Sequence, residues 1–450
     1  MNKTDMELPQ KTSKKPSRFD NVFRALRHRN YRLFFFGQGV SLVGTWMQQI
    51  AVSWLVYRMT NSPFLLGFVG FVGMVPTFVC TPLAGVFADR HDRRNMLIVT
   101  QALSMFQAAV LAFLVLSHQV QVWHIVVLSA FIGIVNSFDI PIRQAFTVEM
   151  IEKKEDLGNA IALNSSVFNA ARLVGPSLAG LLIAWTGEGI CFLLNAFSYL
   201  AVLGSLFSMR MKPFEKLPSS RNLLWELKDG WNYAFHFPPI KLILMFLSLL
   251  SLMGISYQVL MPVFAKDIFR GGPHTLGFLM AMAGVGALTG ALYLAARKSV
   301  IGLAGIAVRM AGLFGVTLII FSFSRSLPLS MLISLGLGFG MMVHMAACNT
   351  ILQTIVEEDK RGRVMSFYTM AFMGTMPFGS LLAGSLASWV GAPLTLFFSG
   401  CCCIAGAVFF FRKLPLIREW IRPIYVAKGI IPEVARGIEA ATGLEGFARE

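Results

Sequence analysis

Charged residues that could contribute to function lie inside long apolar stretches of the sequence, among them Asp139, Arg143 and Arg172. Asp139 and Arg143 are four residues apart, so a helix places them on one face and within reach of each other. Arg172 lies in another apolar stretch, three residues before Gly175 and Pro176. A charge at the centre of a bilayer costs roughly 2.5–3.5 kcal/mol on insertion scales. Each of these side chains is therefore expected to face the interior of the protein and to have a partner there.

Uncharged polar side chains in the same stretches are candidates for contact with a ligand, and a hydrogen bond between helices is the alternative for each. They are Gln48, Gln49, Asn136, Asn164, Asn169, Tyr257, Gln258, His344 and Asn349. For His344 a proton relay is a further interpretation, because histidine titrates near neutral pH. Arg172 either contacts a ligand or fixes its helix, and Gly175 with Pro176 is expected to bend or loosen that helix.

The sequence lacks the residue clusters that catalysis or cofactor binding would need. It has no G-x-x-x-x-G-K-[ST] segment for ATP hydrolysis and no acid, histidine or cysteine cluster with catalytic spacing. Its six cysteines all lie in apolar stretches without a CxxC pair, so zinc and a disulfide framework are not expected. We predict neither an enzyme nor a bound cofactor or metal.

The elements that position these residues must be membrane-spanning helices. The 450 residues are 55% hydrophobic and only 14% charged, which leaves too few polar side chains for a soluble surface. Stretches long enough to cross about 30 Å of hydrocarbon begin near Tyr31, Pro63, Met96, Gln121, Leu157, Ile190, Pro239, Thr275, Gly302, Leu327, Gly362 and Ala392. The sequence predicts an all-α membrane protein of twelve transmembrane helices in two groups of six.

Lys and Arg predict the orientation of these helices. A net charge of +16 would suit nucleic acid, but the basic residues lie between apolar stretches and not on one polar face, so no nucleic acid is expected. The face that holds the amino terminus also collects Arg90, Arg93, Arg94, Lys153, Lys154, Arg297, Lys298, Lys360, Arg361 and Arg363. The other face holds only Arg58, Lys266, Arg270 and Arg325. Both termini are therefore expected in the cytoplasm, with the basic loops against anionic membrane lipid.

The chain divides into five parts. We expect a basic cytoplasmic amino terminus (1–30), a six-helix half (31–210), a cytoplasmic linker (211–238), a second six-helix half (239–411) and a cytoplasmic tail (412–450). Apolar residues recur at helical spacing in the linker from Leu224 to Phe235, which indicates an amphipathic helix on the membrane surface or, alternatively, a partner-binding helix.

The two halves repeat each other. A shift of 204 positions aligns Gly175 with Gly379, Trp185 with Trp389 and Gly187 with Gly391. The fifth and eleventh helices are thus expected to be equivalent, as in two parallel six-helix repeats.

Residues 85–94 (GVFADRHDRR) lie where the second apolar stretch ends. Glycine permits close helix approach, and an acid followed by arginines can form a charge network. This segment resembles the G-x-x-x-D-R-x-G-R-R signature of the major facilitator superfamily, with Asp92 where glycine is usual. Residues 26–33 (LRHRNYRL), 44–49 (GTWMQQ), 137–145 (SFDIPIRQA) and 171–176 (ARLVGP) are similar to the branch that contains the enterobactin exporter, the transmembrane secretion effectors and the macrolide-efflux proteins.

The resemblance covers about residues 22–415 and implies a major facilitator fold that works by alternating access. It implies that the first, fourth, seventh and tenth helices line a central cavity, with the fifth contributing. It also implies a cytoplasmic gate in which Asp139 meets the arginine loop when the protein opens outward; a structural pair of Asp139 with Arg143 that breaks on opening would serve the same role. The residues of this gate are Gly85, Asp89, Arg90, Arg93, Arg94, Asp139 and Arg143.

The segment from Arg172 to Pro176 resembles the fifth-helix motif of exporters in this superfamily. We therefore expect a monomeric secondary-active transporter in the bacterial inner membrane that exports a small organic molecule, such as a siderophore, drug or metabolite, with protons as the coupling ion. An uptake transporter of the same fold and a non-transporting receptor or sensor are the alternatives.

Overall fold

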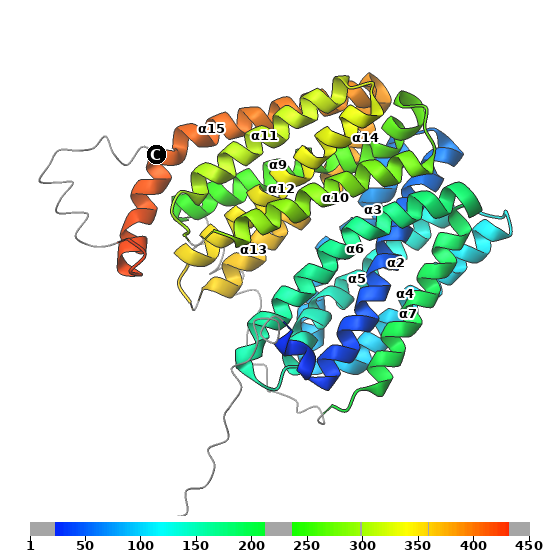
Figure 1. Ribbon diagram of the computed structural model, residues 1–450, viewed down its shortest axis with the longest axis horizontal. Coiled ribbons are helices and arrows are strands. Elements are labelled where there is room, and N and C mark those ends of the chain that lie inside the picture. Colours follow the sequence, from blue (N-terminus) through cyan, green and yellow to red (C-terminus); the bar gives the residue numbers. More distant parts are fainter. Residues whose placement is uncertain (1–22, 212–235, 298, 359, 432–450) are drawn as a thin grey trace, which may run out of the picture.

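The computed structural model describes residues 23–211, 236–297, 299–358 and 360–431, and every regular element in these ranges is a helix (Figure 1). Most of the basic amino terminus, the predicted amphipathic helix of the linker and the end of the tail lie outside the described residues.

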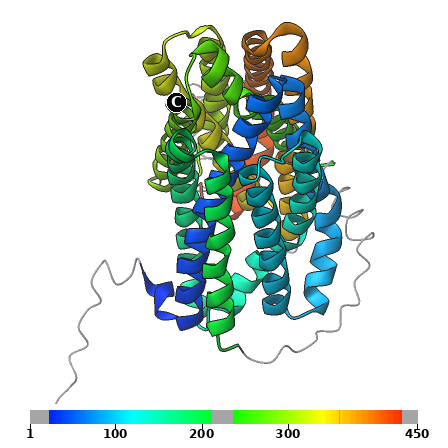
Figure 2. The same cartoon turned by 90° about the vertical axis from the view of Figure 1, so that its right-hand side faces the viewer.

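The first half contains six long helices. They are α2 (Arg29–Thr60), α3 (Pro63–Arg90), α4 (Arg93–Leu116), α5 (Val122–Glu149), α6 (Leu157–Thr186) and α7 (Glu188–Ser208), with short 3₁₀ turns at Arg24–Arg27 and Lys154–Asp156. In both views α2 and α7 lie side by side (Figures 1 and 2).

The second half contains the remaining six membrane crossings. They are α9 (Pro238–Val263), which continues as a π-helical turn (η3, Phe264–Ile268), α10 (Pro273–Ala295), α11 (Leu303–Phe323), α12 (Leu327–Ile355), the pair α13 (Arg361–Met373) and α14 (Met376–Val390), and α15 (Ala392–Ala427). The predicted start of the tail at residue 412 falls inside α15, so the twelfth helix runs on for several turns.

The prediction of twelve transmembrane helices is confirmed. Eleven segments are long and apolar enough to cross a membrane, with α13 and α14 together forming one of them. The exception is α2, which has the length but carries glutamines and arginines along it. Gln38 and Gln48 are buried, so their side chains contact neighbouring helices and not lipid.

The two halves meet at one end of the bundle and diverge toward the other (Figure 1). We call the end at which α2 and α13 begin the basic end, because Arg29, Arg93, Arg94 and Arg361 lie there. The end that carries Arg58, Lys266, Arg270 and Arg325 is called the opposite end. The close contacts between the halves lie near this opposite end and at the middle of the helices.

Candidate functional site

Two glycine-on-glycine crossings join the halves. A Cβ built on Gly67 of α3 would lie 2.8 Å from the Cα of Gly384 in α14, and one on Gly180 of α6 would lie 2.9 Å from the Cα of Gly277 in α10. Backbones can approach this closely only where side chains are absent. Gly180 and Gly384 are 204 positions apart, so the repeat seen in the sequence places one crossing in each half of the interface.

Gly175 also serves a close crossing, this time within the first half. A Cβ there would lie 2.5 Å from the Cβ of Trp46 in α2, and a Cβ on its repeat mate Gly379 would clash with the Leu252 carbonyl oxygen of α9. The helix α6 runs unbroken through Pro176. In the second half, by contrast, the eleventh crossing is interrupted at Gly374 and Thr375, between α13 and α14.

A polar latch joins the halves at the opposite end. The Tyr57 hydroxyl of α2 donates a short hydrogen bond to the Asp267 carboxylate in the π-helical turn η3. The Lys266 ammonium of the same turn donates to the Asn61 side-chain oxygen at 2.6 Å and lies 5.5 Å above the Tyr57 ring. The latch was not predicted from the sequence, although Lys266 is one of the few cations expected on that face.

Asp139 is buried in the first half, with 4% of its surface exposed. It accepts hydrogen bonds from Thr100 (2.9 Å) and Gln101 (2.7 Å) of α4, and the Arg143 guanidinium lies 3.5 Å from its other oxygen. The sequence-based expectation that Asp139 has a partner is met by Arg143 together with two neutral donors on a neighbouring helix.

Two arginines of the motif, Arg93 and Arg94, have other partners in this conformation. Arg93 forms a short ion pair with Glu149 at the end of α5, and Arg94 donates to the carbonyl oxygens of Leu206 (2.8 Å) and Phe207 (3.2 Å). Arg94 thereby satisfies carbonyl groups at the carboxyl end of α7. Gly85, Asp89 and Arg90 lie on the last turns of α3, and the structure does not describe their side chains.

Asp92 replaces the usual glycine of the motif without strain. Its φ of −62° is ordinary for any residue, so the turn needs no glycine here. Its carboxylate accepts from the Asn95 backbone N–H at 3.1 Å and caps the start of α4.

Several of the predicted ligand-contacting residues bind other helices. Gln48 donates to Gln107 of α4 at 2.9 Å and accepts from Asn195 of α7 at 2.8 Å. Asn164 of α6 accepts from the Tyr31 hydroxyl of α2 at 3.0 Å. These hydrogen bonds hold α2 to its neighbours inside the first half.

In the second half His344 is fully buried. Its Nδ1 bonds with the Ala307 carbonyl oxygen at 3.0 Å, and the Phe246 ring packs edge-on against it. Tyr257 is also buried and accepts from Gln258 at 3.1 Å.

The remaining uncharged candidates have local contacts or greater exposure. Asn349 accepts from Gln353, and Asn169 donates to the Ser165 carbonyl oxygen of its own helix at 2.9 Å. Gln49 is exposed and Asn136 half-buried.

Arg172 lies half-buried on α6 with its guanidinium 5.9 Å from the centre of the Trp46 ring of α2. A cation over an indole face is attracted by the ring quadrupole. Its own carbonyl oxygen faces Gly284 of α10 across the boundary between the halves. Arg172 thus lies where α2, α6 and α10 converge, beside the Gly175 crossing.

A cavity of about 500 Å³, here named the interface pocket, lies between the halves on the basic-end side of the Gly67–Gly384 crossing. Apart from Ser248 and Thr375 its lining side chains are apolar. The lining residues are Phe78 of α3, Leu244, Met245 and Ser248 of α9, and Phe367, Met370, Ala371, Gly374, Thr375 and Phe378 at the break between α13 and α14. None of them was a candidate from the sequence, because each is an ordinary apolar or small residue of a membrane helix.

Comparison with known proteins decides the family. Residues 21–424 match the family model described as transmembrane secretion effector. The chain belongs to the transmembrane secretion effector family. The family predicted from the motifs is therefore confirmed.

Relatives of this protein are transporters of the major facilitator superfamily. The staphyloferrin A transporter of Staphylococcus aureus is 27% identical over 393 residues, which cover 86% of this chain and 98% of that protein. The multidrug efflux pump Tap of Mycolicibacterium fortuitum is 25% identical over 85% of this chain and 93% of its own length. The protein is thus a multi-span membrane transporter.

The fold of this protein is that of known transporters. A solved bacterial homologue of the iron transporter ferroportin, in an inward-facing state, aligns with a TM-score of 0.64 at 18% identity, over 85% of this chain and 98% of that one. At this identity the likeness shows a shared fold, and the predicted major facilitator fold is confirmed.

Proposed function

We propose that this protein is a monomeric secondary-active exporter of small amphipathic organic molecules, and that it works by alternating access with protons as the coupling ion. The observation that carries the proposal is the interface pocket, a largely apolar cavity between two halves that cross at paired glycines. Rocking about such crossings exposes a site between the halves to each membrane face in turn. Both the crossings and the pocket are formed within one chain, so a monomer suffices.

Export requires that a substrate can enter from the cytoplasm, and the position of the pocket meets this requirement. By the positive-inside rule the basic end faces the cytoplasm of the bacterial cell, with both termini. The pocket lies on that side of the Gly67–Gly384 crossing, and the latch of Tyr57 and Asp267 closes the opposite end. A molecule would therefore load from the cytoplasm or the inner leaflet. The names of relatives, among them a multidrug efflux pump and a macrolide efflux protein, agree with this direction.

The lining favours amphipathic substrates of varied shape. Small-molecule sites typically have volumes of about 300–1,000 Å³, and this pocket falls within that range. Phenylalanine rings provide apolar area, and flexible methionines such as Met245 and Met370 adapt to different outlines. Thr375 already donates to the Ala371 carbonyl oxygen at 2.9 Å, which leaves Ser248 as the lining group for a polar contact with substrate.

Asp139 is the group we propose to link transport with protons. It is a carboxylate buried within the first half and 3.5 Å from Arg143, so a change of its partner can be linked to the movement of the halves. Such a change is what the motif implies for the outward-open state, in which the arginine loop would be the new partner of Asp139.

Transport in everted membrane vesicles tests this function. Vesicles that contain the protein and hold a proton gradient are offered ethidium, a macrolide and staphyloferrin A in turn. We expect at least one of them to accumulate inside and to dissipate the proton gradient in proportion to its concentration. Accumulation only in right-side-out vesicles would instead identify an uptake transporter, and saturable binding without movement would identify a receptor or sensor.

The pocket itself is tested by filling it. Met245 is 53% exposed and borders the cavity, so Met245→Trp should reduce transport at least several-fold while the protein still inserts. Leu332→Trp on α12 is the matched control, because Leu332 is 64% exposed and lies outside the lining. Equal transport by the two variants would exclude the pocket as the substrate site.

A further inference from the structure

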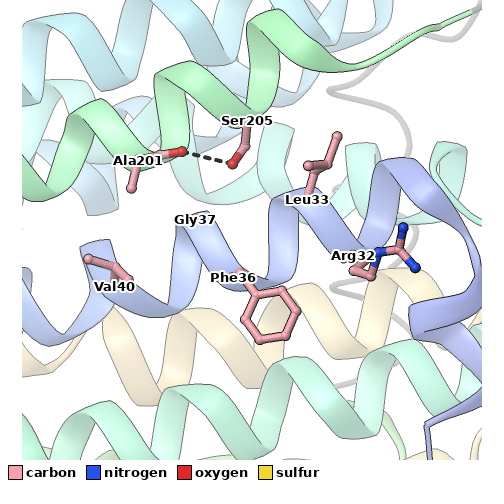
Figure 3. A pocket seen from close by; sticks show the side chains of 7 residues that line it. All are labelled: Arg32, Leu33, Phe36, Gly37, Val40, Ala201 and Ser205. Atoms are coloured by element: carbon pink, nitrogen blue, oxygen red, sulfur yellow. Dashed lines mark hydrogen bonds between the residues drawn. The ribbon is translucent and has the colours of Figure 1, made fainter.

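A second cavity, of about 370 Å³, lies between α2 and α7 near the basic end. Figure 3 shows Val40, Gly37 and Leu33 in a row along α2, beneath Ala201 and Ser205 of α7, with Arg32 at one end of the row. A Cβ on Gly37 would lie 2.5 Å from the Ser205 hydroxyl oxygen and 2.8 Å from the Ala201 carbonyl oxygen. Helices α2 and α7 therefore touch at Gly37, and the groove runs along the outside of this contact, with backbone and small side chains as its floor.

The groove opens toward lipid. Its rim residues Phe36 and Val40 are apolar, yet they are 61% and 55% exposed. The polar residues Thr45 and Gln49 of α2 lie on the other side of that helix, since a rotation of 100° per residue separates them from Phe36 and Val40 by roughly half a turn. An apolar groove on the outer face of a membrane helix can receive a hydrocarbon chain.

Positive charge gathers where the groove reaches the basic end. Arg29 and Arg32 are both exposed and lie three residues apart, one turn before Leu33 and Phe36 on the same helix. Asn30 donates to the Arg210 carbonyl oxygen at 2.9 Å and accepts from its backbone N–H, so the end of α7 with exposed Arg210 is held beside them. Arg29, Arg32 and Arg210 thus form a positively charged border at the basic end of the apolar groove.

Among the described residues of the second half, an aromatic side chain occupies the corresponding place. Gly175 contacts Trp46 of α2, and its repeat mate Gly379 contacts Ile255 of α9. Equivalent positions of α2 and α9 are therefore 209 residues apart. This shift places Phe246 at the position of Gly37. The Phe246 ring stacks on Phe410 of α15, with centroids 4.3 Å apart. The groove is thus a feature of one half and not a consequence of the repeat.

From this geometry we infer that the groove binds one anionic glycerophospholipid. The phosphate contacts Arg29, Arg32 and Arg210, and an acyl chain lies along the outer surface of the α2–α7 contact, against Leu33, Phe36 and Val40. Arginine suits this position, because its stem can lie along apolar surface while its guanidinium forms charge-assisted bonds with phosphate oxygens. The lipid would fasten α2 to α7.

Lipid binding is measured by titrating the purified full-length protein in detergent and recording native mass spectra. The probes are dioleoyl phosphatidylglycerol, dioleoyl phosphatidylcholine and glycerol 3-phosphate. We expect the wild type to prefer phosphatidylglycerol over phosphatidylcholine, and glycerol 3-phosphate to bind far more weakly. Arg29→Gln and Arg32→Gln should each weaken phosphatidylglycerol binding about fivefold, the factor that corresponds to the usual contribution of one basic residue near an anionic headgroup.

The apolar part of the site has its own variant. Ala201→Trp fills the groove and should weaken phosphatidylglycerol binding as strongly as the loss of an arginine; Ala201→Leu is used if the tryptophan variant fails to fold. Matched controls come from the other half. Ala405 is equivalent to Ala201, Lys241 is equivalent to Arg32, and both control residues are exposed. Ala405→Trp and Lys241→Gln should leave binding unchanged.

Three results would overturn the inference. The first is equal affinity for phosphatidylglycerol and phosphatidylcholine, which would remove the role of the arginines. The second is an equal loss in the control variants, which would make the binding unspecific. The third is glycerol 3-phosphate binding as tightly as the lipid with no effect of Ala201→Trp, which would indicate a phosphate site without an acyl groove.

Discussion

At the scale of single residues, the partners of Asp139 decide how a gate could work. Its carboxylate is satisfied by Thr100, Gln101 and Arg143, all within the first half. Arg93 is engaged by Glu149 at the same time. Since a hydrogen bond to a charged group contributes about 1.5–3 kcal/mol, an exchange of Arg143 for the arginine loop would leave the free energy nearly balanced, as a reversible gate requires.

Replacing Asp139 by asparagine tests this exchange. The asparagine side chain keeps the shape and can still accept from Thr100 or Gln101, but it loses the charge that faces Arg143. We expect Asp139→Asn to express almost normally and to transport several-fold more slowly. Glu149→Gln is the control, because its pair with Arg93 is partly solvated and such pairs contribute only about 0–1 kcal/mol. Transport at the wild-type rate in Asp139→Asn would refute the gate.

The latch at the opposite end allows a second test at the same scale. Tyr57→Phe removes the hydroxyl that donates to Asp267 across the halves. A loss of about 1.5 kcal/mol would raise the fraction of molecules open at that end roughly tenfold. Distances between spin labels at Gln119 and Ser326, exposed positions on opposite halves, measure this fraction.

The control for the latch is Glu188→Gln. Glu188 binds Arg58 at 2.7 Å within the first half, so its loss should lower the unfolding temperature without moving the two labels apart. If Tyr57→Phe leaves the distance distribution unchanged as well, the latch does not hold the halves together.

At the scale of helices, the glycine crossings set how closely the halves can approach. A Cβ on Gly67 would clash with the Ser380 carbonyl oxygen, and no rotamer change relieves this contact because the oxygen belongs to the backbone. Ser380 also donates to the Gly67 carbonyl oxygen at 3.1 Å, so the crossing is both packed and hydrogen-bonded. Helices α3 and α14 can therefore pivot here only while position 67 is glycine.

Gly67→Ala should consequently hold the halves apart at this crossing and abolish most transport, although alanine is the better helix former. Gly204→Ala on α7 is the matched control, since nothing lies within 4 Å of a Cβ at that position. It should stabilise the protein by up to about 1 kcal/mol and leave transport intact. Transport assays together with thermal unfolding separate the two effects, and normal transport by Gly67→Ala would exclude the crossing as a pivot.

The helices were predictable from the sequence because the length of each apolar stretch can be compared directly with the thickness of the membrane. The same is true of the repeat: Gly187 and Gly391, aligned by the sequence, both adopt positive φ, 82° and 84°, at equivalent helix starts. Side-chain partners were not predictable, because they depend on which helix faces meet. Gln48 and His344 are bound to other helices, while Phe78 and Met370, which line the interface pocket, had no polar atom to mark them.

At the scale of the whole molecule, the orientation of the bundle determines on which side the interface pocket opens. Gln119→Cys, at the opposite end, should react with an impermeant thiol reagent added to intact cells. Ala296→Cys, at the basic end, should react only after the membrane is opened. Both are made in a variant whose native cysteines are serine. Cysteine at Gly187 or Gly391 is less suitable, because the positive φ there would strain it. Reversed labelling would contradict the orientation that the loop charges predict and would mean that the interface pocket opens to the outside in this conformation.

The polar character of α2 has a consequence for how the protein is made. This helix leaves the ribosome before the other described spans, yet it alone among them falls short of the apolarity of a spanning segment. The side chains that satisfy it come later: Gln107 is 59 positions beyond Gln48, Asn164 is 133 beyond Tyr31, and Asn195 is 147 beyond Gln48. Until α4, α6 and α7 have been synthesised, the insertion machinery or a chaperone must shelter α2 from lipid. Truncated chains that end before α6 are therefore expected to lose their first helix from the membrane and to be degraded.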